Sequence, residues 1–178
     1  MVKCLMNFNW LKSFFVAYLC FFSSSFAVEA AYQRHQLEAV YIFRIANFIQ
    51  WGEEKRSELT FCGDKQDPVV QTLIVISKNK KIQGQNVSVK AQEKSILNSE
   101  CNIYIANENT PSFFLKKLNK NTLTISSNPN FTKELGMIEL RLVKGKVKPA
   151  INLDNLENAT FRISSQLLRL SIIEGNNH

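Results

Sequence analysis

GMIELRLVKGKVKPAINLDNLENATFRISSQLLRLSII, residues 136–173, is the stretch that decides the fold. Apolar and charged residues alternate over residues 138–142, which is the period-2 pattern of a half-buried strand. Lys144 and Gly145 suit a tight turn, and apolar residues alternate again over residues 147–151. The two runs and their turn predict a β-hairpin.

A capped helix is expected to follow this hairpin. Ser164 or Ser165 can supply the cap, because either hydroxyl can accept a hydrogen bond from a backbone N–H of the first helical turn. Leucine and isoleucine residues between 167 and 173 give the helix an apolar side, and Gly175 is placed to end it.

The rest of the chain alternates short strands with helices. A helix over residues 33–51 carries a wide apolar stripe, in which Leu37, Tyr41, Ile45 and Phe48 recur at helical spacing. The same patterns predict strands at 59–62, 86–90, 102–106 and 122–126, helices at 69–77 and 112–118, and one helical turn at 131–135. This order predicts an α/β fold, a three-layer sandwich in which helices pack on both faces of a mixed β-sheet.

The amino-terminal residues have the organisation of a secretory signal peptide. Two lysines and a strongly apolar run, residues 14–22, precede a group of small residues. We place cleavage after Ala27, so that residues 1–27 are removed and residues 31–175 form a single domain; Ala30 is a second cleavage option. The alternative is an uncleaved anchor, but the apolar run is shorter than the roughly 20 residues that span a membrane.

The chain has 22 basic and 15 acidic side chains and a formal net charge of +7, which falls to +5 without the two lysines of the signal peptide. A surplus of this size keeps a small domain soluble and is weak evidence for a polyanionic partner. Lysines cluster at 78–81 and 144–148, as expected of solvated faces or protected sheet edges. Aromatic residues do not interleave with these lysines, so we expect no nucleic-acid partner.

Cys62 and Cys101 remain after export, and an even number of cysteines in an oxidising compartment predicts a disulfide. A bridge across 39 residues stabilises the fold by roughly 4 kcal/mol in the chain-entropy model. Cys62 ends one expected strand and Cys101 begins another, positions that neighbouring parallel strands would hold at opposite ends. The bridge therefore requires staggered strands or one cysteine in a loop that folds back.

The sequence offers no recognisable catalytic set. The chain has six glycines, and it contains no phosphate-binding glycine pattern, nucleophile elbow or zinc-protease motif. His35 is the only internal histidine, so we expect no zinc site and no cofactor. Asp64 and Asp67 lack a third ligand nearby, which makes a metal-dependent hydrolase the weakest hypothesis. We expect a binding or regulatory protein rather than an enzyme.

Four polar residues near the carboxyl terminus are candidate ligand or partner contacts. Arg162 and Ser164 lie where the chain enters the last helix, where backbone N–H groups and a forked guanidinium can bind a carboxylate or phosphate. The alternative is that Arg162 is only a surface side chain and Ser164 only a cap. We expect the amide of Asn152 to hold the loop of residues 154–158, whereas Arg169 stays exposed to meet an acidic partner group.

Three blocks of the sequence resemble the YfiR family. They are EAVYIF with ANFIQW at 38–43 and 46–51; LTFCGD with CNIYI at 59–64 and 101–105; and GMI, INL and ISSQLL at 136–138, 151–153 and 163–168. Together they span nearly the whole expected domain in the family's order. Some relatives carry a further cysteine pair near positions 136 and 140, which this chain lacks.

The resemblance implies a periplasmic α/β domain that acts through a partner. Family members repress an inner-membrane diguanylate cyclase by binding its periplasmic portion, which lowers cyclic-di-GMP signalling, and an outer-membrane lipoprotein sequesters some of them. Because Arg162 and Ser164 match a ligand-contacting place in the family motif, the alternative function is a small-ligand sensor for another membrane protein. The family often dimerises, and the wide first-helix stripe places Tyr41, Ile45 and Phe48 near a homodimer or partner interface.

Overall fold

The computed structural model describes residues 25–52, 57–93, 101–118 and 120–175 of the chain. The chain divides into two compact units, residues 1–34 and 35–178, and helix α2, Ser25–Ile45, contains residues of both. Most of the expected signal peptide, residues 1–24, lies outside the described residues. Its cleavage and the domain limits at residues 31 and 175 therefore stay predictions.

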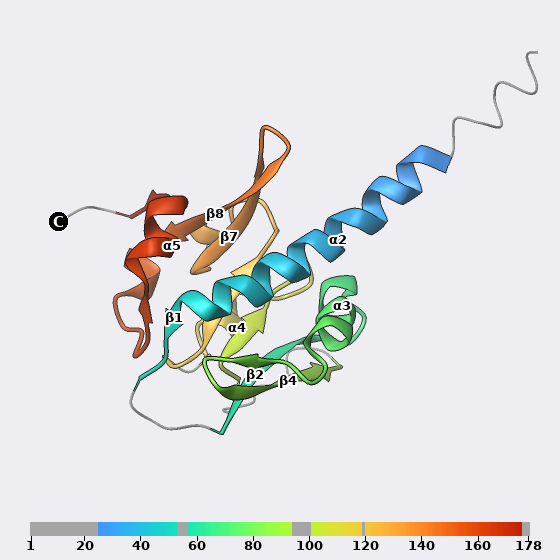
Figure 1. Ribbon diagram of the computed structural model, residues 1–178. Helices are drawn as coiled ribbons and strands as arrows, with labels where there is room; N and C mark the ends of the chain where they lie inside the picture. Colours follow the sequence, from blue (N-terminus) through green and yellow to red (C-terminus); the bar gives the residue numbers. More distant parts are fainter. Residues whose placement is uncertain (1–24, 53–56, 94–100, 119, 176–178) are drawn as a thin grey trace, which may run out of the picture. The chain divides into compact units, whose positions relative to one another are not determined.

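Within the described part of the second unit, eight strands form one mixed sheet in the order β10-β8-β7-β6-β5-β2-β4-β3 (Figure 1). Strands β4, β2, β5, β6 and β7 run parallel, whereas β3 pairs antiparallel with β4, and β8 pairs antiparallel with β7 and parallel with β10. The strands are β2 Glu58–Asp64, β3 Lys81–Ile82, β4 Gln85–Gln92, β5 Ile103–Ile105, β6 Leu123–Ser126, β7 Ile138–Val143, β8 Lys146–Asn152 and β10 Ile172–Glu174.

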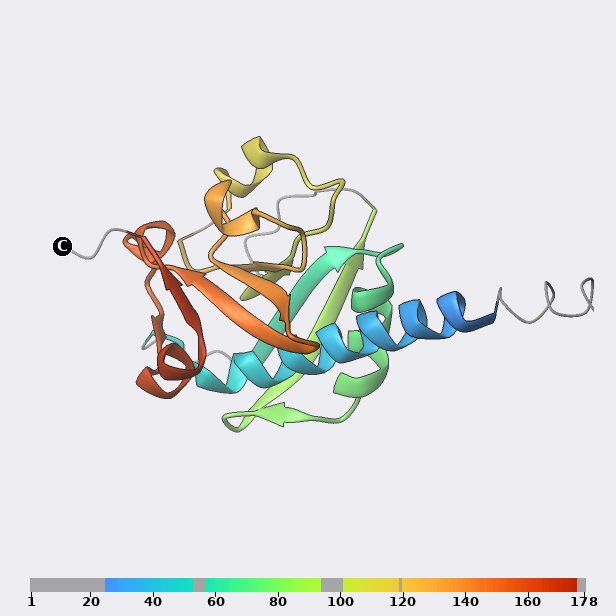
Figure 2. The same ribbon diagram turned by 90° about the horizontal axis from the view of Figure 1, so that it is seen from above.

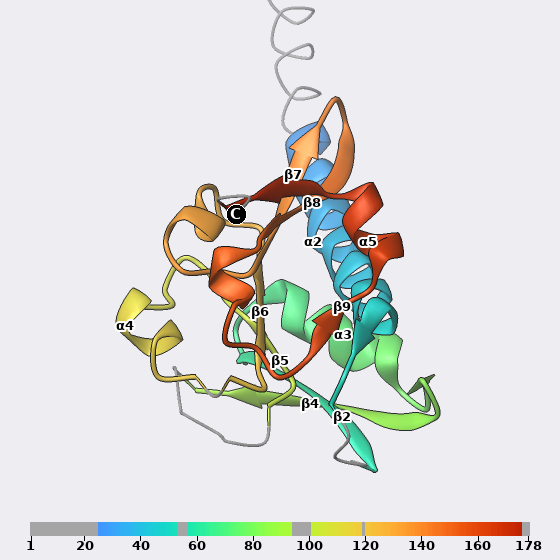
Figure 3. The same ribbon diagram turned by 90° about the vertical axis from the view of Figure 1, so that its left-hand side faces the viewer.

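Helices cover both faces of this sheet, which confirms the predicted three-layer α/β architecture. Helix α3, Pro68–Ser77, and the part of α2 from residue 35 onward lie on one face, whereas the short helix α4, Ser112–Leu115, lies on the other (Figures 2 and 3). The 3-10 helix η2, Phe131–Lys133, contributes Phe131 to the same small apolar cluster as α4. The two faces are therefore unequally covered.

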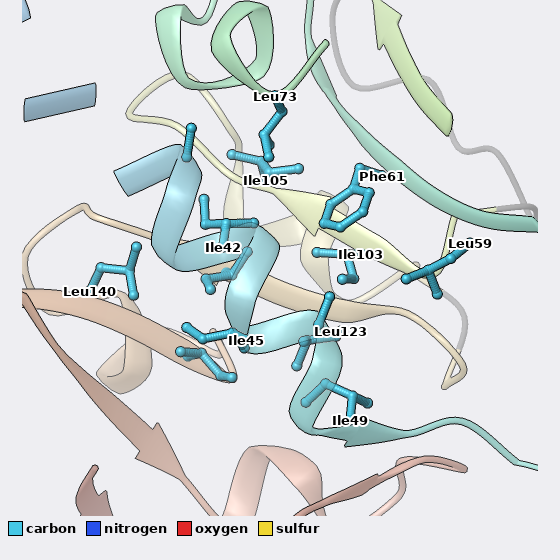
Figure 4. Close-up of a cluster of buried hydrophobic side chains, with 14 of the residues drawn as sticks. Ile42, Ile45, Ile49, Leu59, Phe61, Leu73, Ile103, Ile105, Leu123 and Leu140 are labelled. Atoms are coloured by element: carbon cyan, nitrogen blue, oxygen red, sulfur yellow. The ribbon is translucent and has the colours of Figure 1, made fainter. Parts of the chain in front are cut away.

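Alternation along the strands divides the buried side chains between these two faces. Phe61 of β2 and Ile103 of β5 belong to the large core under α2 and α3, whereas Cys62 and Tyr104, the next residue of each strand, belong to the small cluster. Figure 4 shows the large core, in which Ile42 and Ile45 of α2 face the labelled strand residues. Burial of this apolar surface is the main stabilising contribution to the fold.

Gly63 of β2 lets α3 pack closely onto the sheet. A Cβ atom at this position would lie 2.5 Å from Val70 Cγ2 and 3.2 Å from the carbonyl oxygen of Ile105. Both distances are shorter than normal van der Waals contacts, so only glycine fits here without a shift of α3. The close approach brings the start of α3 next to the carboxyl end of β2.

The predicted hairpin is present as β7 and β8. Lys144 and Gly145 form its turn with φ values of 49° and 75°, a left-handed pair that suits a two-residue hairpin connection. The alternation predicts a buried side for Leu142, but Leu142 is 64% exposed. It faces solvent near the hairpin tip, beyond the part of the sheet that the core covers.

The predicted final helix is wrong in length. Helix α5 is Ser165–Leu170, and residues 172–174 form β10 alongside residues 150–152 of β8. The helix stops because the backbone of β8 offers hydrogen-bonding groups that a short strand can satisfy. Leu170 is predicted to lie on the apolar side of the helix, but it is 65% exposed.

The first helix also ends earlier than residue 51. Helix α2 stops at Ile45, the 3-10 helix η1 covers Ala46–Phe48, and the strand β1, Ile49–Gln50, follows. Strand β1 pairs antiparallel with β9, Arg162–Ile163, in a separate two-stranded sheet. Residues 49–50 therefore form a strand, although the sequence pattern predicts helix, because they pair with residues more than one hundred positions away.

The structure joins Cys62 and Cys101 by a disulfide, as the sequence predicts, with the two Cα atoms 5.8 Å apart. Cys62 lies in β2, whereas Cys101 lies in the irregular segment before β5. The loop alternative for the bridge is therefore the one observed. The bond adds a covalent link beneath the sheet face that only short helices cover.

Candidate functional site

The order of the parallel strands reverses between β2 and β5. From β2 the chain passes through α3 and β3 to β4 on one side, and it then crosses to β5 on the other side of β2. The parallel order β4-β2-β5-β6-β7 is the doubly wound order 2-1-3-4-5. In open sheets of this kind, ligands bind outside the carboxyl ends of the strands at the reversal.

A cavity of about 390 Å³ lies at this position, and we call it the switch-point cavity. Its lining includes Asp64 at the end of β2, residues 105–109 at the end of β5 and residues 126–128 at the end of β6. The start of α3, three residues of α2 and Leu140 of β7 also line it. The strand ends therefore bring together polar side chains that are far apart in the sequence.

Three carboxylates of the switch-point cavity are held by hydrogen bonds within the chain. Asp64 Oδ1 accepts from Gln66 N at 2.8 Å, and Asp67 Oδ1 accepts from Val69 N at 2.8 Å as the N-cap of α3. Glu38 is only 6% exposed, and its Oε2 accepts from Ser127 Oγ at 3.0 Å. These bonds fix the carboxylate positions.

The surroundings of Asp67 in the cavity change its pKa. Burial raises the pKa of Asp67 above its ordinary value, and the negative charges of Glu38 and Asp64 raise it further, against the opposing hydrogen bond from Val69 N. Of the described residues that line the cavity, none is lysine or arginine. Four of the described lining residues carry carboxylates, namely Glu38, Asp64, Asp67 and Glu108.

A second group of charges lies across β7, β8 and β10, and we call it the Arg141 cluster. Arg141 Nε donates to Glu139 Oε1 at 2.8 Å, and Arg141 Nη1 donates to Glu174 Oε1 at 2.7 Å. Thr132 Oγ1 donates to Glu174 Oε2 at 2.6 Å and accepts from Arg141 Nη2 at 3.0 Å. The cluster therefore ties β10 and η2 to β7.

The carboxylates of the Arg141 cluster differ from those of the cavity in their pKa values. Burial alone would raise the pKa of Glu139, but hydrogen bonds from Arg141 and Thr132 outweigh it and lower the pKa. Hydrogen bonds from Arg141 and Thr132 also lower the pKa of Glu174. Both carboxylates share the Arg141 guanidinium as a partner within the chain, which indicates a structural role.

Asn152 connects the Arg141 cluster to the loop that follows β8. Its Nδ2 donates to the carbonyl oxygen of Thr132 at 3.0 Å, and its Oδ1 accepts from Asp154 N at 3.0 Å, at the start of the 3-10 helix η3, Asp154–Leu156. The hydrogen bonds expected between Asn152 and this loop are present. Asn155, which the sequence analysis missed, donates to the carbonyl oxygens of Thr132 and Gly136.

None of the four predicted contact residues lines the switch-point cavity. Ser164 caps α5 and its Oγ accepts from Leu167 N at 3.3 Å, while Arg162 lies on β9 opposite Gln50. Arg162 and Arg169 are both exposed, and no ion pair involves either of them within the described part of the chain. Helix α5 has only six residues, so its dipole is small, and Ser164 already accepts from one of its free N–H groups.

The apolar stripe predicted for the first helix packs mainly against the core of the same chain. Ile45 is 3% exposed in the large core, and Tyr41 and Phe48 are partly buried against that core. Leu37 is 43% exposed at the start of the stripe. Ile45 is therefore too buried to contact a second copy of the chain. A homodimer stays a proposal, and its interface must be formed by residues other than Ile45.

A family model described as YfiR/HmsC-like matches residues 35–172. The chain belongs to the YfiR/HmsC-like family. The match confirms the family that three sequence blocks predicted, and it includes every residue that lines the switch-point cavity. No curated protein matches the sequence significantly.

Membership of the YfiR/HmsC-like family indicates a regulatory rather than a catalytic protein. Among the described residues, no group of three or more histidine, cysteine, aspartate or glutamate side chains is arranged to hold a metal ion. In the same part of the chain, no helix is both long and apolar enough to cross a membrane.

Proposed function

We propose that this protein is a periplasmic regulator that binds and represses the periplasmic part of an inner-membrane diguanylate cyclase, and so lowers cyclic-di-GMP signalling. The observation that carries the proposal is the YfiR/HmsC-like match over residues 35–172. The signal-peptide pattern of residues 1–27 and the disulfide between Cys62 and Cys101 support an oxidising compartment outside the cytoplasm.

The exposed surface around α5 is the proposed contact for the cyclase. Arg162 and Arg169 are exposed there, and so are the apolar residues Leu170 and Ile173, at 65% and 41%. An exposed apolar group beside cations is typical of a surface that meets an acidic partner. Asn152 contributes indirectly, because it holds the loop between β8 and β9.

Deletion of the gene tests this function in the producing bacterium. We expect cellular cyclic-di-GMP to rise on deletion, to return when the wild-type gene is supplied, and to stay low when the cyclase is also deleted. The Arg169→Ala variant should restore repression incompletely, whereas Lys117→Ala, an exposed change on the opposite sheet face, should restore it fully. Unchanged cyclic-di-GMP in the single deletion would contradict the proposal.

Export is tested separately on protein isolated from the periplasm. The intact mass should correspond to a chain that begins after Ala27 and should increase by two hydrogens on reduction. Two reactive thiols in freshly isolated protein, or a mass that includes residues 1–27, would contradict the assigned compartment. Co-purification from the same cells would also reveal an outer-membrane lipoprotein partner and a homodimer.

A small-ligand sensor is the second candidate function, and the switch-point cavity is the observation that favours it. The sequence points instead to Arg162 and Ser164 as an anion site. Calorimetry with small carboxylates and nucleotides, on the wild type and on Arg162→Ala, distinguishes the two places. Equal binding by both proteins would exclude Arg162 as the anchor.

A further inference from the structure

The outer half of the β7-β8 hairpin extends beyond the eight-stranded sheet. Strand β7 pairs with β6 only at Ile138 and Glu139, and β8 pairs with β10 only from Ala150 onward. Within the described part of the chain, residues 140–149 therefore pair only with each other, and we call them the hairpin ribbon (Figure 1). Both edges of this ribbon are uncovered, so its outer side chains are accessible to a partner.

The side chains of the hairpin ribbon are segregated by type. Leu142 lies opposite Val147 on the face that continues the large core. Arg141 lies opposite Lys148 on the other face. Leu142 is 64% exposed, and Val143, which precedes the turn, is 38% exposed. Two adjacent apolar side chains are therefore exposed to solvent at the tip of the ribbon.

Positive charge surrounds these apolar side chains. Residues 140–151 carry four basic side chains and no acidic one. Arg141 pairs with Glu139 and Glu174, but three exposed lysines form no side-chain hydrogen bond or ion pair in the described part of the chain: Lys144, Lys146 and Lys148. The tip therefore complements a negatively charged surface.

The small size of the exposed tip favours a lipid bilayer over a protein as its partner. The tip is confined to residues 142–148, whereas a stable protein interface takes about 20–30 residues from each partner. A bilayer requires no complementary shape, because apolar side chains enter between the headgroups and lysines contact the phosphates. Exposed apolar residues ringed by lysines satisfy both requirements.

We propose that the hairpin ribbon docks the protein on the surface of an anionic phospholipid bilayer. Leu142 and Val143 lie among the headgroups, and the three lysines lie against the lipid phosphates. Lipid binding is a property of this chain alone, so it holds whether or not a diguanylate cyclase is the partner.

Co-sedimentation with vesicles tests the proposal on protein purified from the periplasm. One set of vesicles contains equal parts of phosphatidylglycerol and phosphatidylcholine, and the other contains phosphatidylcholine alone. We expect binding to the anionic vesicles, with an affinity that falls as salt is added, and no binding to the neutral vesicles. Absence of binding to the anionic vesicles, or equal binding to both sets, would overturn the proposal.

Replacement of the three lysines locates the contact. The triple variant Lys144→Gln, Lys146→Gln and Lys148→Gln should bind anionic vesicles about 100-fold more weakly, since each lysine near such a surface contributes roughly fivefold. The matched control replaces the three exposed lysines of residues 78–81 by glutamine and removes the same charge. Salt screens lysines that do not touch the bilayer, so the control should stay within about threefold of the wild type. Equal weakening by both variants would refute the assignment to the ribbon.

Leu142→Gln tests the apolar part of the contact. We expect about tenfold weaker binding to anionic vesicles, because the leucine no longer leaves water on docking. Leu170→Gln is the control, since Leu170 is 65% exposed on α5 and should not contact the bilayer. Cooperative urea unfolding checks that each variant is folded. Wild-type affinity in the folded Leu142→Gln variant would contradict insertion of the tip. Loss of self-association in that variant, with no vesicle binding by the wild type, would instead assign the ribbon to a second copy of the chain.

Discussion

The Arg141 cluster and the switch-point cavity place carboxylates of one domain in opposite surroundings. Glu139 and Glu174 surround a guanidinium, and their pKa values are lowered. Asp67 lies among other carboxylates, and its pKa is raised. The contrast shows that the chain pairs carboxylates with a guanidinium where β10 is held, whereas at the cavity it places Asp67 close to other carboxylates.

Removing the guanidinium should have the largest effect, because it leaves two carboxylates without their cation. We expect Arg141→Met to lower the free energy of unfolding by about 3 kcal/mol. Arg169→Met is the matched control, since it makes the same change at an exposed arginine and should cost less than about 0.5 kcal/mol. Urea unfolding at neutral pH measures both changes. Equal losses of unfolding free energy would show that the paired Arg141 contributes no more to stability than the exposed Arg169.

Asn152 tests whether the loop beside the Arg141 cluster depends on its amide. Asn152→Ala leaves the carbonyl oxygen of Thr132 and the N–H of Asp154 without this partner, and we expect a loss of about 2 kcal/mol. The control is Asn158→Ala, which changes an exposed asparagine of the same connection and should lie within about 0.5 kcal/mol of the wild type. The assigned roles would be wrong if thermal melts showed Arg169→Ala to be more destabilising than Asn152→Ala.

Acidification should act in opposite directions on the two regions. The pKa values of Glu139 and Glu174 are lowered in the folded state, so the stability they contribute is present above their ordinary value of 4.5. It is lost as pH falls through the lowered pKa values, because the unfolded chain takes up protons first. Asp67 behaves in reverse, since its pKa is raised above 3.8 and its unfavourable ionisation is relieved on acidification.

Urea unfolding between neutral pH and pH 3 resolves these contributions. The wild type should lose stability below about pH 4.5, and Arg141→Met should show a shallower loss because it lacks the interactions that lower the two pKa values. An unchanged acid slope in Arg141→Met would show that the cluster does not govern this dependence.

Substitutions of Asp67 should have the smallest effect. They distinguish the contribution of its helix cap from that of its negative charge. Asparagine caps a helix as well as aspartate does, so Asp67→Asn keeps the acceptor for Val69 N and removes the buried negative charge. We expect it to raise the free energy of unfolding by about 0.5 kcal/mol at neutral pH, whereas Asp67→Ala should lower it by about 1 kcal/mol through loss of the cap. Destabilisation by both changes would mean that the charge is itself stabilising.

Local pattern accounts for the parts of the fold that short-range rules control. The hairpin of β7 and β8 follows from alternation and from the Lys144-Gly145 turn, and α3 follows from Pro68 and its cap. Strands β1 and β10 were missed because they form only when partners distant in the sequence supply hydrogen bonds. Glu139 alternates like a solvent-facing residue, yet it is buried because η2 covers that side of β7.

The candidate sites also differ in how far local sequence predicts them. The hydrogen bond from Asp154 N to Asn152 was predictable because the two residues are close in the sequence. The hydrogen bond from Asn152 to Thr132 and the switch-point cavity depend instead on the tertiary fold. A usable signal was present in the sequence, since polar residues follow three consecutive parallel strands at Asp64, Asn107 and Asn128. The strand order that brings these positions together could not be derived from spacing alone.

The most direct test of the proposed function is the rate at which a full-length, detergent-solubilised diguanylate cyclase with a periplasmic portion forms cyclic-di-GMP in the presence of this protein. We expect the disulfide-bonded protein purified from the periplasm to lower that rate at roughly micromolar concentration, and Arg169→Ala to require more protein for the same effect. A rate that stays unchanged at saturating protein, with the cyclase active and the protein folded, would contradict repression by direct binding.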